Sequence, residues 1–236
     1  MARNFEPLSR AFLARAAPRG CTRALDLGCG PGHTTRLLRE LCVPRELVGL
    51  DASEAYVRMA AEASGPRAAF AVHDVTRVPF PGGPADLIHA RLLLSHLPEP
   101  ERALACWRGE LRPGGRLLLD EVERIDSQDP VFVRYLELVR NMLRARGQEL
   151  EIGPRLDAAT RSAPRAHDEL RELTLPAARA AEMFAPNLAE FRGRPEIREQ
   201  ASESELDALA AGLAARERGE VGLTVTWCMR QLAIEA

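Results

Sequence analysis

The chain has 236 residues, of which 46% are hydrophobic and 28% are charged, and its formal net charge at pH 7 is -2. This length and composition suit a globular chain with one sizeable core, and the small net charge excludes a bulk attraction to nucleic acid or to an anionic membrane. No apolar run reaches the roughly 18 residues of a membrane span, and the first residues lack the apolar core of a signal peptide, so we expect a cytoplasmic protein.

Cysteine usage indicates reduced thiols and no metal centre. The five cysteines are scattered along the chain, and no two of them form a C-x-x-C pair. Neither a zinc site nor a disulfide framework is therefore predicted. The histidines and acidic residues also lack metal-ligand spacing, so we expect no metal ion.

The N-terminal 20 residues predict a short amphipathic helix. Phe5, Leu8, Phe12 and Leu13 recur at helical spacing, and Pro18-Arg19-Gly20 then breaks the pattern. Two interpretations stay open at this point. The helix packs on a sheet or over the first glycine turn, or it forms part of a lid.

Strands and helices alternate through the first half of the chain. We expect strands at residues 23–27, 46–50, 68–72, 85–90 and 116–120, with helices at about 32–41, 53–63 and 100–111. Pro113-Gly114-Gly115 is the expected turn into the fifth strand. This alternation predicts a parallel sheet with helices on both faces, and ligands of such sheets lie at the carboxyl ends of the strands.

The pattern loosens after Glu121. Helices are expected at about 132–147, 155–161, 177–192 and 202–213, and strands at 169–175 and 222–234. Ser202-x-x-Glu205 is a capping box that opens the last helix. The prediction is an α/β fold with a Rossmann-like, doubly wound, seven-stranded, mostly parallel sheet. Helical insertions follow strand 5 and separate strands 6 and 7.

A glycine-rich turn follows the first strand, in the run Leu25-Asp26-Leu27-Gly28-Cys29-Gly30-Pro31-Gly32. Glycines let the backbone approach a ligand closely, and the next helix directs free N–H groups at it. Dinucleotide enzymes use a related G-x-G-x-x-G turn to hold pyrophosphate. Here the third dinucleotide glycine is replaced by His33, and Asp26 would repel a pyrophosphate but suits a cationic ammonium group.

The turn resembles motif I of the class I S-adenosylmethionine-dependent methyltransferases, of the small-molecule type. Further landmarks of that family follow in order: Asp51 after the second strand, His73-Asp74-Val75 after the third, Asp86–Arg91 leading to Ser95-His96-Leu97-Pro98, and Leu111–Gly115 before the fifth strand. The resemblance covers residues 20–121. Beyond them it supports only the general layout of the last two strands.

The resemblance implies a binding site for S-adenosylmethionine, with S-adenosylhomocysteine as product. Asp26 would accept a hydrogen bond from the ammonium group, directly or through water, and Asp51 would hold both ribose hydroxyls. The other implied contacts are Gly28, Cys29 and Gly30 to the methionine part, Ala52 to the adenine face, Asp74 and Val75 to the adenine edge, and Ala90 and Arg91 beside the methionine tail. The competing interpretation of Asp51 and Asp74 is simple turn or helix capping.

The reaction that the resemblance implies is in-line displacement at the sulfonium methyl by an oxygen, nitrogen or carbon nucleophile. Alignment of the reactants alone is worth up to roughly 7–11 kcal/mol in favourable cases, so a general base is optional. His96 and Glu121 are the candidate bases. Alternatively, His96 only fixes a turn and Glu121 only caps the fifth strand, and His89 is expected to be a packed residue.

The substrate signal is weaker than the cofactor signal. No basic stripe with interleaved aromatics is present, which disfavours a nucleic-acid substrate. The aromatic residues and methionines of the second half of the chain either line an apolar pocket or form the core of a cap. Three arginines, Arg134, Arg155 and Arg192, offer a weaker alternative, an acidic substrate.

We therefore expect a single methyltransferase domain that acts on a small molecule, in biosynthetic or secondary metabolism, without nucleic-acid or membrane partners. Its parts would be an N-terminal helix (1–20), a cofactor-binding core (21–121), a mainly helical cap (122–221) and a terminal strand (222–236). Two other functions stay open: methylation of a macromolecule such as tRNA or protein, and a catalytically silent cofactor-binding regulator. The oligomeric state is undecided, with a homodimer as one option.

Overall fold

The computed structural model describes residues 2–18, 20–220 and 222–236. Its α-helices are α1 Ala2–Ala16, α2 His33–Cys42, α3 Glu54–Ser64, α4 Pro100–Gly109, α5 Pro130–Ala145, α6 Gly153–Thr160, α7 Ala177–Phe191, α8 Pro195–Arg198 and α9 Glu203–Glu217. The strands are β1 Arg23–Leu27, β2 Glu46–Asp51, β3 Ala69–Val72, β4 Ala85–Arg91, β5 Leu111–Ser127, β6 Arg165–Leu175 and β7 Val225–Glu235. Two short 3₁₀ turns lie at Gly65–Arg67 and Leu94–His96.

The strands form one seven-stranded sheet in the order β3-β2-β1-β4-β5-β7-β6. Strands β1 to β5 pair in parallel, and β7 runs antiparallel to both β5 and β6. The predicted α/β fold with a mostly parallel, seven-stranded sheet is confirmed. The strand order changes direction at β1 and β4, which is where open α/β sheets bind their ligands.

Side chains that alternate along the strands build two cores, one on each face of the sheet. Ala24, Leu87 and Leu118 face α1 and α2, where they pack with Phe12 and Leu38. Their strand neighbours Leu25, Ile88 and Leu117 belong to the opposite core, which α4 and α6 cover. The period of two residues in a strand explains why one apolar run supplies both layers.

The N-terminal helix packs on the sheet, as one of the two interpretations of its sequence proposed. Phe12 and Leu13 are buried in the core that α1 shares with α2. Phe5, nearer the start of α1, contacts Trp227 of β7 edge to face, with ring centroids 5.9 Å apart. One helix therefore contacts both the sheet and the base of the cap.

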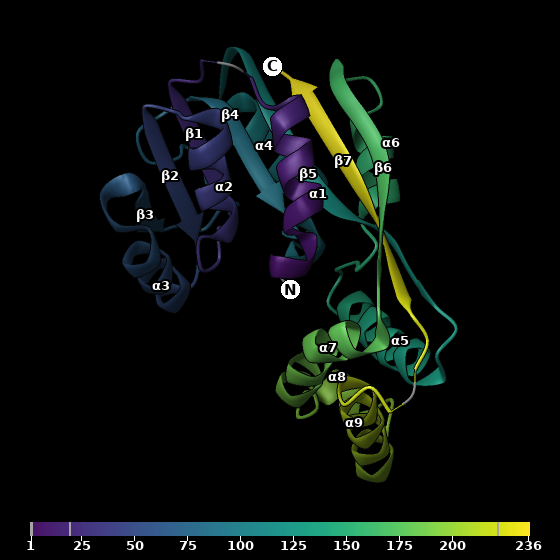
Figure 1. Ribbon diagram of the computed structural model, residues 1–236. Helices are drawn as coiled ribbons and strands as arrows, with labels where there is room; N and C mark the ends of the chain where they lie inside the picture. Colours follow the sequence, from purple (N-terminus) through teal and green to yellow (C-terminus); the bar gives the residue numbers. More distant parts are fainter. Residues whose placement is uncertain (1, 19, 221) are drawn as a thin grey trace.

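Helices α5, α7, α8 and α9 form a separate lobe at one end of the sheet (Figure 1). The long strands β5, β6 and β7 run from the sheet toward this lobe, and the arrowheads of β2 and β4 point to the same end. The lobe has its own apolar core, in which Phe132, Phe184 and Trp227 are buried. The carboxyl ends of the parallel strands therefore face the helical cap.

Three expectations about the second half of the chain need correction. Strand β5 covers 111–127 instead of 116–120, and Pro113-Gly114-Gly115 lies within it, next to a register shift opposite Ala85–Leu87. Strand β6 begins at Arg165 rather than at residue 169. Strand β6 pairs with β7 along its whole length, and β7 also extends β5 to Ser127, whereas the start of β5 at Leu111 pairs with Ala85 of β4. The sequence pattern also missed the short helix α8.

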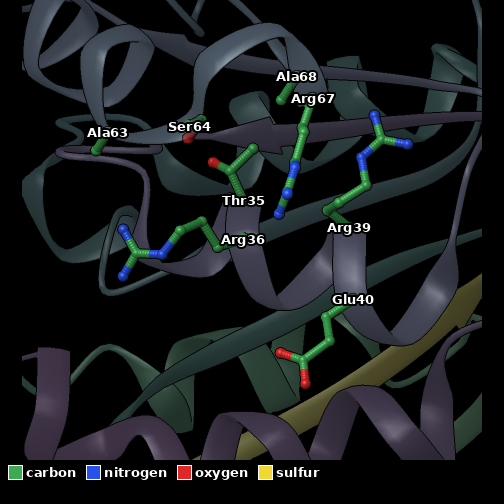
Figure 2. Close-up of a pocket in the computed structure, with 8 residues that line it drawn as sticks. All are labelled: Thr35, Arg36, Arg39, Glu40, Ala63, Ser64, Arg67 and Ala68. Atoms are coloured by element: carbon green, nitrogen blue, oxygen red, sulfur yellow. The ribbon is translucent and has the colours of Figure 1, made fainter.

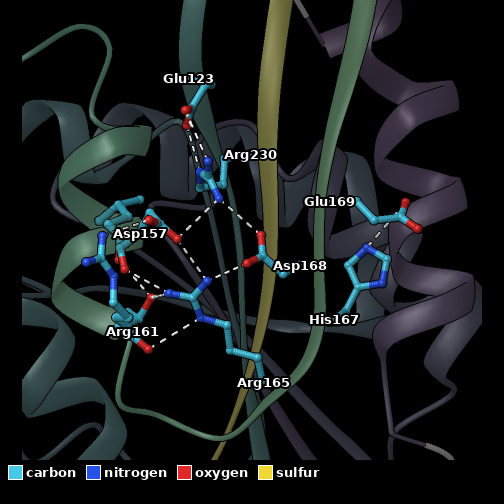
Figure 3. Close-up of polar contacts among 10 residues, drawn as sticks. Glu123, Asp157, Arg161, Arg165, His167, Asp168, Glu169 and Arg230 are labelled. Atoms are coloured by element: carbon cyan, nitrogen blue, oxygen red, sulfur yellow. Dashed lines mark hydrogen bonds and ion pairs between the residues drawn. The ribbon is translucent and has the colours of Figure 1, made fainter.

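Ion pairs fasten α6 to the outer strands (Figure 3). Arg230 of β7 donates to Glu123 of β5 at 2.7 Å and to Asp168 of β6 at 3.1 Å. Arg165 of β6 binds Asp157 of α6 at 2.9 Å and also contacts Asp168. Because several charges share partners in partly buried positions, this network holds α6 against the strands more firmly than isolated surface pairs would.

Among the described residues, no helix has the length and apolar character that would let it cross a membrane.

Candidate active site

The glycine turn between β1 and α2 has the backbone geometry that its sequence predicts. Gly28, Gly30 and Gly32 all have positive φ angles, of 60°, 51° and 82°. A Cβ atom on Gly28 would lie 2.7 Å from Cδ1 of Leu93, which packs directly against the turn. The backbone conformation therefore favours glycine at position 28, and a larger residue would also have to displace the side chain of Leu93.

Asp26 lies beneath this turn and is almost fully buried, with 1% of its surface exposed. Oδ2 accepts hydrogen bonds from the hydroxyls of Thr34 and Thr35, at 2.8 and 2.6 Å. Oδ1 lies 2.9 Å from Nδ1 of His89. These three contacts use three of about four acceptor positions of a carboxylate, so one position is left for a further donor.

Asp51 ends β2 beside the turn and is half-buried. Its Oδ2 accepts the N–H of Gly30 at 2.9 Å, and its Oδ1 accepts the N–H of Ser53 at 2.8 Å. Each oxygen keeps a further acceptor position toward solvent. The neighbouring Ala52 is exposed, so it leaves open space next to the carboxylate.

The segment after β3 presents Asp74 at the same edge of the sheet. Its Oδ1 accepts from both the hydroxyl and the N–H of Thr76, at 2.7 and 3.0 Å, and these bonds lower the pKa of Asp74. Val75 is buried, and its carbonyl accepts a hydrogen bond from Nε1 of Trp107 at 2.8 Å. Asp74 thus has the exposed, charged carboxylate that a hydrogen-bond donor on a ligand would meet.

The loop that follows β4 joins the glycine turn to the cap. Ala90 pairs with Leu27 across the sheet and is buried. Arg91 donates to the hydroxyl of Ser9 in α1, at 3.1 Å. Leu92 then adopts φ 51°, a left-handed conformation that is uncommon for a residue with a bulky side chain. The backbone therefore turns sharply between the glycine turn and the cap.

Glu121 of β5 holds this loop in place. It is fully buried, and its Oε1 accepts the N–H groups of Leu93 and Leu94 at 2.8 and 3.0 Å. Oε2 is buried and has no partner among the described residues. Burial raises the pKa of Glu121 to about 7. Glu121 lies in the middle of β5 and not at its end. It therefore holds the loop in position instead of capping the strand.

His96 lies at the rim of the cap, in the 3₁₀ turn after β4. Its side chain is exposed to solvent on one side, and the desolvation of the rest of the ring lowers its pKa. A lowered pKa keeps the imidazole neutral near pH 7, which is the form that accepts a proton. His89 is fully buried against Asp26, in agreement with its expected packing role.

A cavity of about 170 Å³ lies between the loop after β4 and the cap. Its walls are mostly apolar and come from α1, β5, α5, α7 and β7. The lining residues are Phe5, Leu92, Ser95, His96, Val122, Ile125, Tyr135, Leu136, Val139, Met142, Leu143, Leu150, Met183, Phe184, Asn187, Phe191 and Trp227. The sequence left open whether the aromatic residues and methionines of the second half line a pocket or form the core of the cap. They do both, because the core that they form surrounds the cavity.

The three arginines considered for an acidic substrate are engaged elsewhere. Arg134 donates to Glu137 and to the carbonyl of Gln200, both at 2.9 Å. Arg155 pairs with Glu101, and Arg192 pairs with Asp207 at 2.7 Å. None of the three lines the cavity under the cap.

A second cavity, of about 360 Å³, lies between α2 and the segment that leads into β3 (Figure 2). Arg36, Arg39 and Arg67 contribute to its walls. It lies at the amino end of β3, away from the strand ends that carry the acids of the site. Within the described ranges, no group of three or more His, Cys, Asp or Glu residues is arranged to hold a metal ion.

The residues around the turn fit S-adenosylmethionine better than a dinucleotide. The positive φ angles of Gly28, Gly30 and Gly32 give the turn a backbone conformation that glycine adopts most readily. Asp26 and Asp51 place negative charge under and beside it, which suits an ammonium group and a ribose diol but opposes a pyrophosphate.

Residues 25–119 match a family model described as a methyltransferase domain. This part of the chain is a methyltransferase domain, similar to those of class I S-adenosylmethionine-dependent methyltransferases. The matched range lies inside the cofactor-binding core that the sequence predicts at 21–121. The methyltransferase domain therefore contains the glycine turn, both acids beside it and the loop after β4.

Curated relatives share this domain but not the whole chain. Trans-aconitate 2-methyltransferase of Streptomyces avermitilis is 36% identical over 124 residues, which cover 50% of this chain and 46% of the relative. The enzyme of the same name from Methylobacterium radiotolerans is 40% identical over 106 residues, covering 45% and 40%. The chain thus spans less than half the length of each of these relatives.

Solved structures show how widely this methyltransferase fold is shared. Phosphoethanolamine N-methyltransferase 2 of Haemonchus contortus, in complex with S-adenosylhomocysteine, aligns over 97% of this chain and 52% of its own, with a TM-score of 0.58 and 18% identity. A cyclopropane synthase of Mycobacterium tuberculosis aligns over 98% and 84%, with a TM-score of 0.61 and 17% identity. At these identities the likeness concerns the fold alone.

Sequence reasoning missed several residues of the candidate site. Thr34 and Thr35 fix Asp26, and Trp107 fixes the segment at Val75. Threonines at the start of a helix are a usable signal, because their hydroxyls readily bond to groups beside a helix terminus. The contact between Trp107 and Val75 joins residues 32 positions apart and has no local pattern.

Proposed function

We propose that this chain transfers the methyl group of S-adenosylmethionine to a small-molecule acceptor. The observation that carries the proposal is the grouping of Asp26 and Asp51 around a turn in which Gly28, Gly30 and Gly32 all have positive φ angles. The named relatives and the solved methyltransferases support the same reaction class.

We assign the cofactor contacts by the resemblance and by the free acceptor positions of each acid. Asp26 would take the ammonium group at its remaining acceptor position, and Asp51 would take the ribose hydroxyls. Asp74 and Val75 would contact the adenine edge, with Ala52 at its face. The remaining contacts, to the methionine part, belong to Gly28, Cys29, Gly30, Ala90 and Arg91.

When bound, S-adenosylmethionine would supply an electrophilic methyl group: the acceptor lone pair would bond to the methyl carbon as the C–S bond breaks, and the electrons of that bond would stay on the sulfur of the leaving S-adenosylhomocysteine. The chain's own part is to bring acceptor and methyl together and to exclude water, and alignment supplies much of the acceleration. Where the acceptor must lose a proton, the neutral imidazole of His96 is the proposed proton acceptor. Glu121 is proposed to act on the loop, not on the acceptor.

The enclosed cavity favours a small molecule over a macromolecule. A cavity of about 170 Å³ behind buried aromatic walls admits one ring or a short branched chain. A protein or tRNA substrate would instead need an open surface that presents cationic or hydrogen-bonding groups. A silent regulator would have no need of an acceptor cavity beside the cofactor loop.

The test combines cofactor binding with transfer of label. Calorimetry should detect S-adenosylhomocysteine binding to the wild type and a loss of about tenfold or more in Asp51→Ala, since a hydrogen bond to a charged group is worth about 1.5–3 kcal/mol. Asp126→Ala, an exposed acid on β5, is the matched control and should bind normally. Labelled cofactor with a metabolite extract should label small molecules.

Three results would contradict parts of the proposal. Unchanged affinity in Asp51→Ala would refute the ribose contact. Label that appears only in protein or RNA would refute the small-molecule acceptor, and tight binding without transfer to any acceptor would favour a silent regulatory domain.

A further inference from the structure

We infer that the acceptor is an uncharged, monocyclic aromatic compound with a hydroxyl or amino group, and not a polycarboxylate such as the one named for the curated relatives. This inference rests on the proposed methyl transfer and adds the chemical class of the acceptor. It comes from the cavity under the cap, which lies outside most of the region that the family model matches.

The cavity walls are built for an aromatic ring. Tyr135 and Phe184 stack with their ring centroids 4.3 Å apart, and Phe184 contacts Trp227 at 5.6 Å. Met142 and Met183 complete the wall, and thioether sulfurs make favourable contacts with ring edges. A bound ring would therefore find edge and face partners on several sides.

Among the side chains that the structure describes, none that lines the cavity offers a positive charge to a carboxylate. The polar lining groups are Ser95, His96, Tyr135 and Asn187, and the described lining contains no arginine. The lowered pKa of His96 leaves that ring neutral near pH 7. A tricarboxylate would have to lose its hydration without an ionic partner, which costs several kcal/mol for each charge.

Two of the four polar groups of the cavity, Ser95 and His96, lie on the side that adjoins the cofactor loop, whereas Tyr135 and Asn187 belong to the cap helices α5 and α7. Ser95 and His96 belong to the loop after β4, whose Leu93 packs against the glycine turn at Gly28. A ring seated among the cap residues would thus direct its hydroxyl or amino group toward the loop and the methyl donor. Its apolar part would face Tyr135 and the other buried walls.

The size of the cavity sets the upper limit of the acceptor. Its volume, about 170 Å³, is close to the roughly 150 Å³ of an engineered apolar cavity that binds benzene. One substituted ring fills this space. The match in both volume and chemistry selects p-cresol as a probe, with trans-aconitate as the charged alternative.

The experiment measures binding of both probes by calorimetry to the protein saturated with S-adenosylhomocysteine. We expect p-cresol to bind and trans-aconitate to show no heat at the same concentration. Val139→Trp, on the cavity wall of α5, should weaken p-cresol binding at least about tenfold, because the new side chain occupies the ring's space. Val133→Trp is the matched control on the same helix, where the side chain is 45% exposed, and it should bind p-cresol as the wild type does.

The affinity for S-adenosylhomocysteine separates a failed inference from a misfolded variant. If Val139→Trp loses that affinity, the smaller substitution Val139→Phe takes its place. Tighter binding of trans-aconitate than of p-cresol, or unchanged p-cresol binding in a folded cavity variant, would overturn the acceptor class and leave the methyl transfer standing. Absence of S-adenosylhomocysteine binding to the wild type would instead overturn the proposed function, and this inference with it.

Discussion

Replacing Glu121 by glutamine should change how the stability of the protein depends on pH. The carboxyl group is fully buried, and burial raises its pKa from 4.5 to about 7. Below pH 4.5 the group is protonated in both the folded and the unfolded chain. Between pH 4.5 and 7 it stays protonated only in the folded chain, which therefore binds more protons, so the free energy of unfolding falls as the pH rises through this window.

The size of the effect follows from the same values. Each unit by which the pKa of the folded chain exceeds that of the unfolded chain corresponds to about 1.4 kcal/mol. The free energy of unfolding therefore falls by about 3 kcal/mol between pH 4.5 and pH 7. Glutamine keeps one oxygen that can accept from the N–H groups of Leu93 and Leu94, but it does not ionise. The amide N–H₂ of glutamine would take the place of Oε2, which is buried and has no hydrogen-bond partner among the described residues. This unsatisfied donor lowers the stability of the variant by a constant amount at every pH.

Urea unfolding at a series of pH values measures the effect as a difference between the two proteins. The free energy of unfolding of wild type minus that of Glu121→Gln should fall by about 3 kcal/mol from pH 4.5 to 7.5 and then run level, because above this range the carboxyl is ionised in both states. Glu62→Gln, at an exposed position of α3, controls for the loss of one negative charge. A difference that stays constant across the window, or rises with pH, would show that the carboxyl is not desolvated and would refute this account.

Three further substitutions test other parts of the site. Gly28→Ala should cost about 1–2 kcal/mol of stability through the positive φ angle and weaken S-adenosylhomocysteine binding through the contact with Leu93, and normal binding by calorimetry would contradict the close packing. The methyl-transfer rate of the wild type should fall at pH values below the lowered pKa of His96, since desolvation favours the neutral ring, and His96→Gln should be slower and lack this pH dependence. Trp107→Phe should lower the free energy of unfolding by about 1–3 kcal/mol because the carbonyl of Val75 loses its donor, and an unchanged urea midpoint would argue against that bond.

The first half of the fold could be predicted from sequence because its signals are local. The strand, the glycines and the helix start at residues 23–42 lie within one short segment, and the cap of α3 at Ser53 depends on a residue three positions ahead. The residues that specify each of these elements lie within the element or next to it, so no distant contact is needed to predict it. The capping box at Ser202 and Glu205 was predictable for the same reason.

The length of β5 and the role of Glu121 could not be predicted, because both depend on distant partners. Strand β5 continues to Ser127 because β7, about a hundred residues later, pairs with it along that length. Glu121 is held by backbone groups 27 and 28 residues earlier in the chain. A lone carboxylate at a predicted strand end gives no sign of such partners, so the sequence offered only a general base or a strand cap as the role of Glu121.

The middle of β5 couples the two halves of the candidate site. The carbonyl of Asp120 accepts the N–H of Leu92 at 3.1 Å, and the next side chain, Glu121, accepts the two N–H groups that follow. These three bonds hold Leu92 at its positive φ angle, a conformation that costs on the order of 1–3 kcal/mol. The side chain of Asp120 meanwhile accepts from Ser9 of α1 and Gln231 of β7. The backbone carbonyl of Asp120 and the side chain of Glu121 therefore fix the loop between the glycine turn and the cavity, so a change of Glu121 should alter cofactor and acceptor binding together.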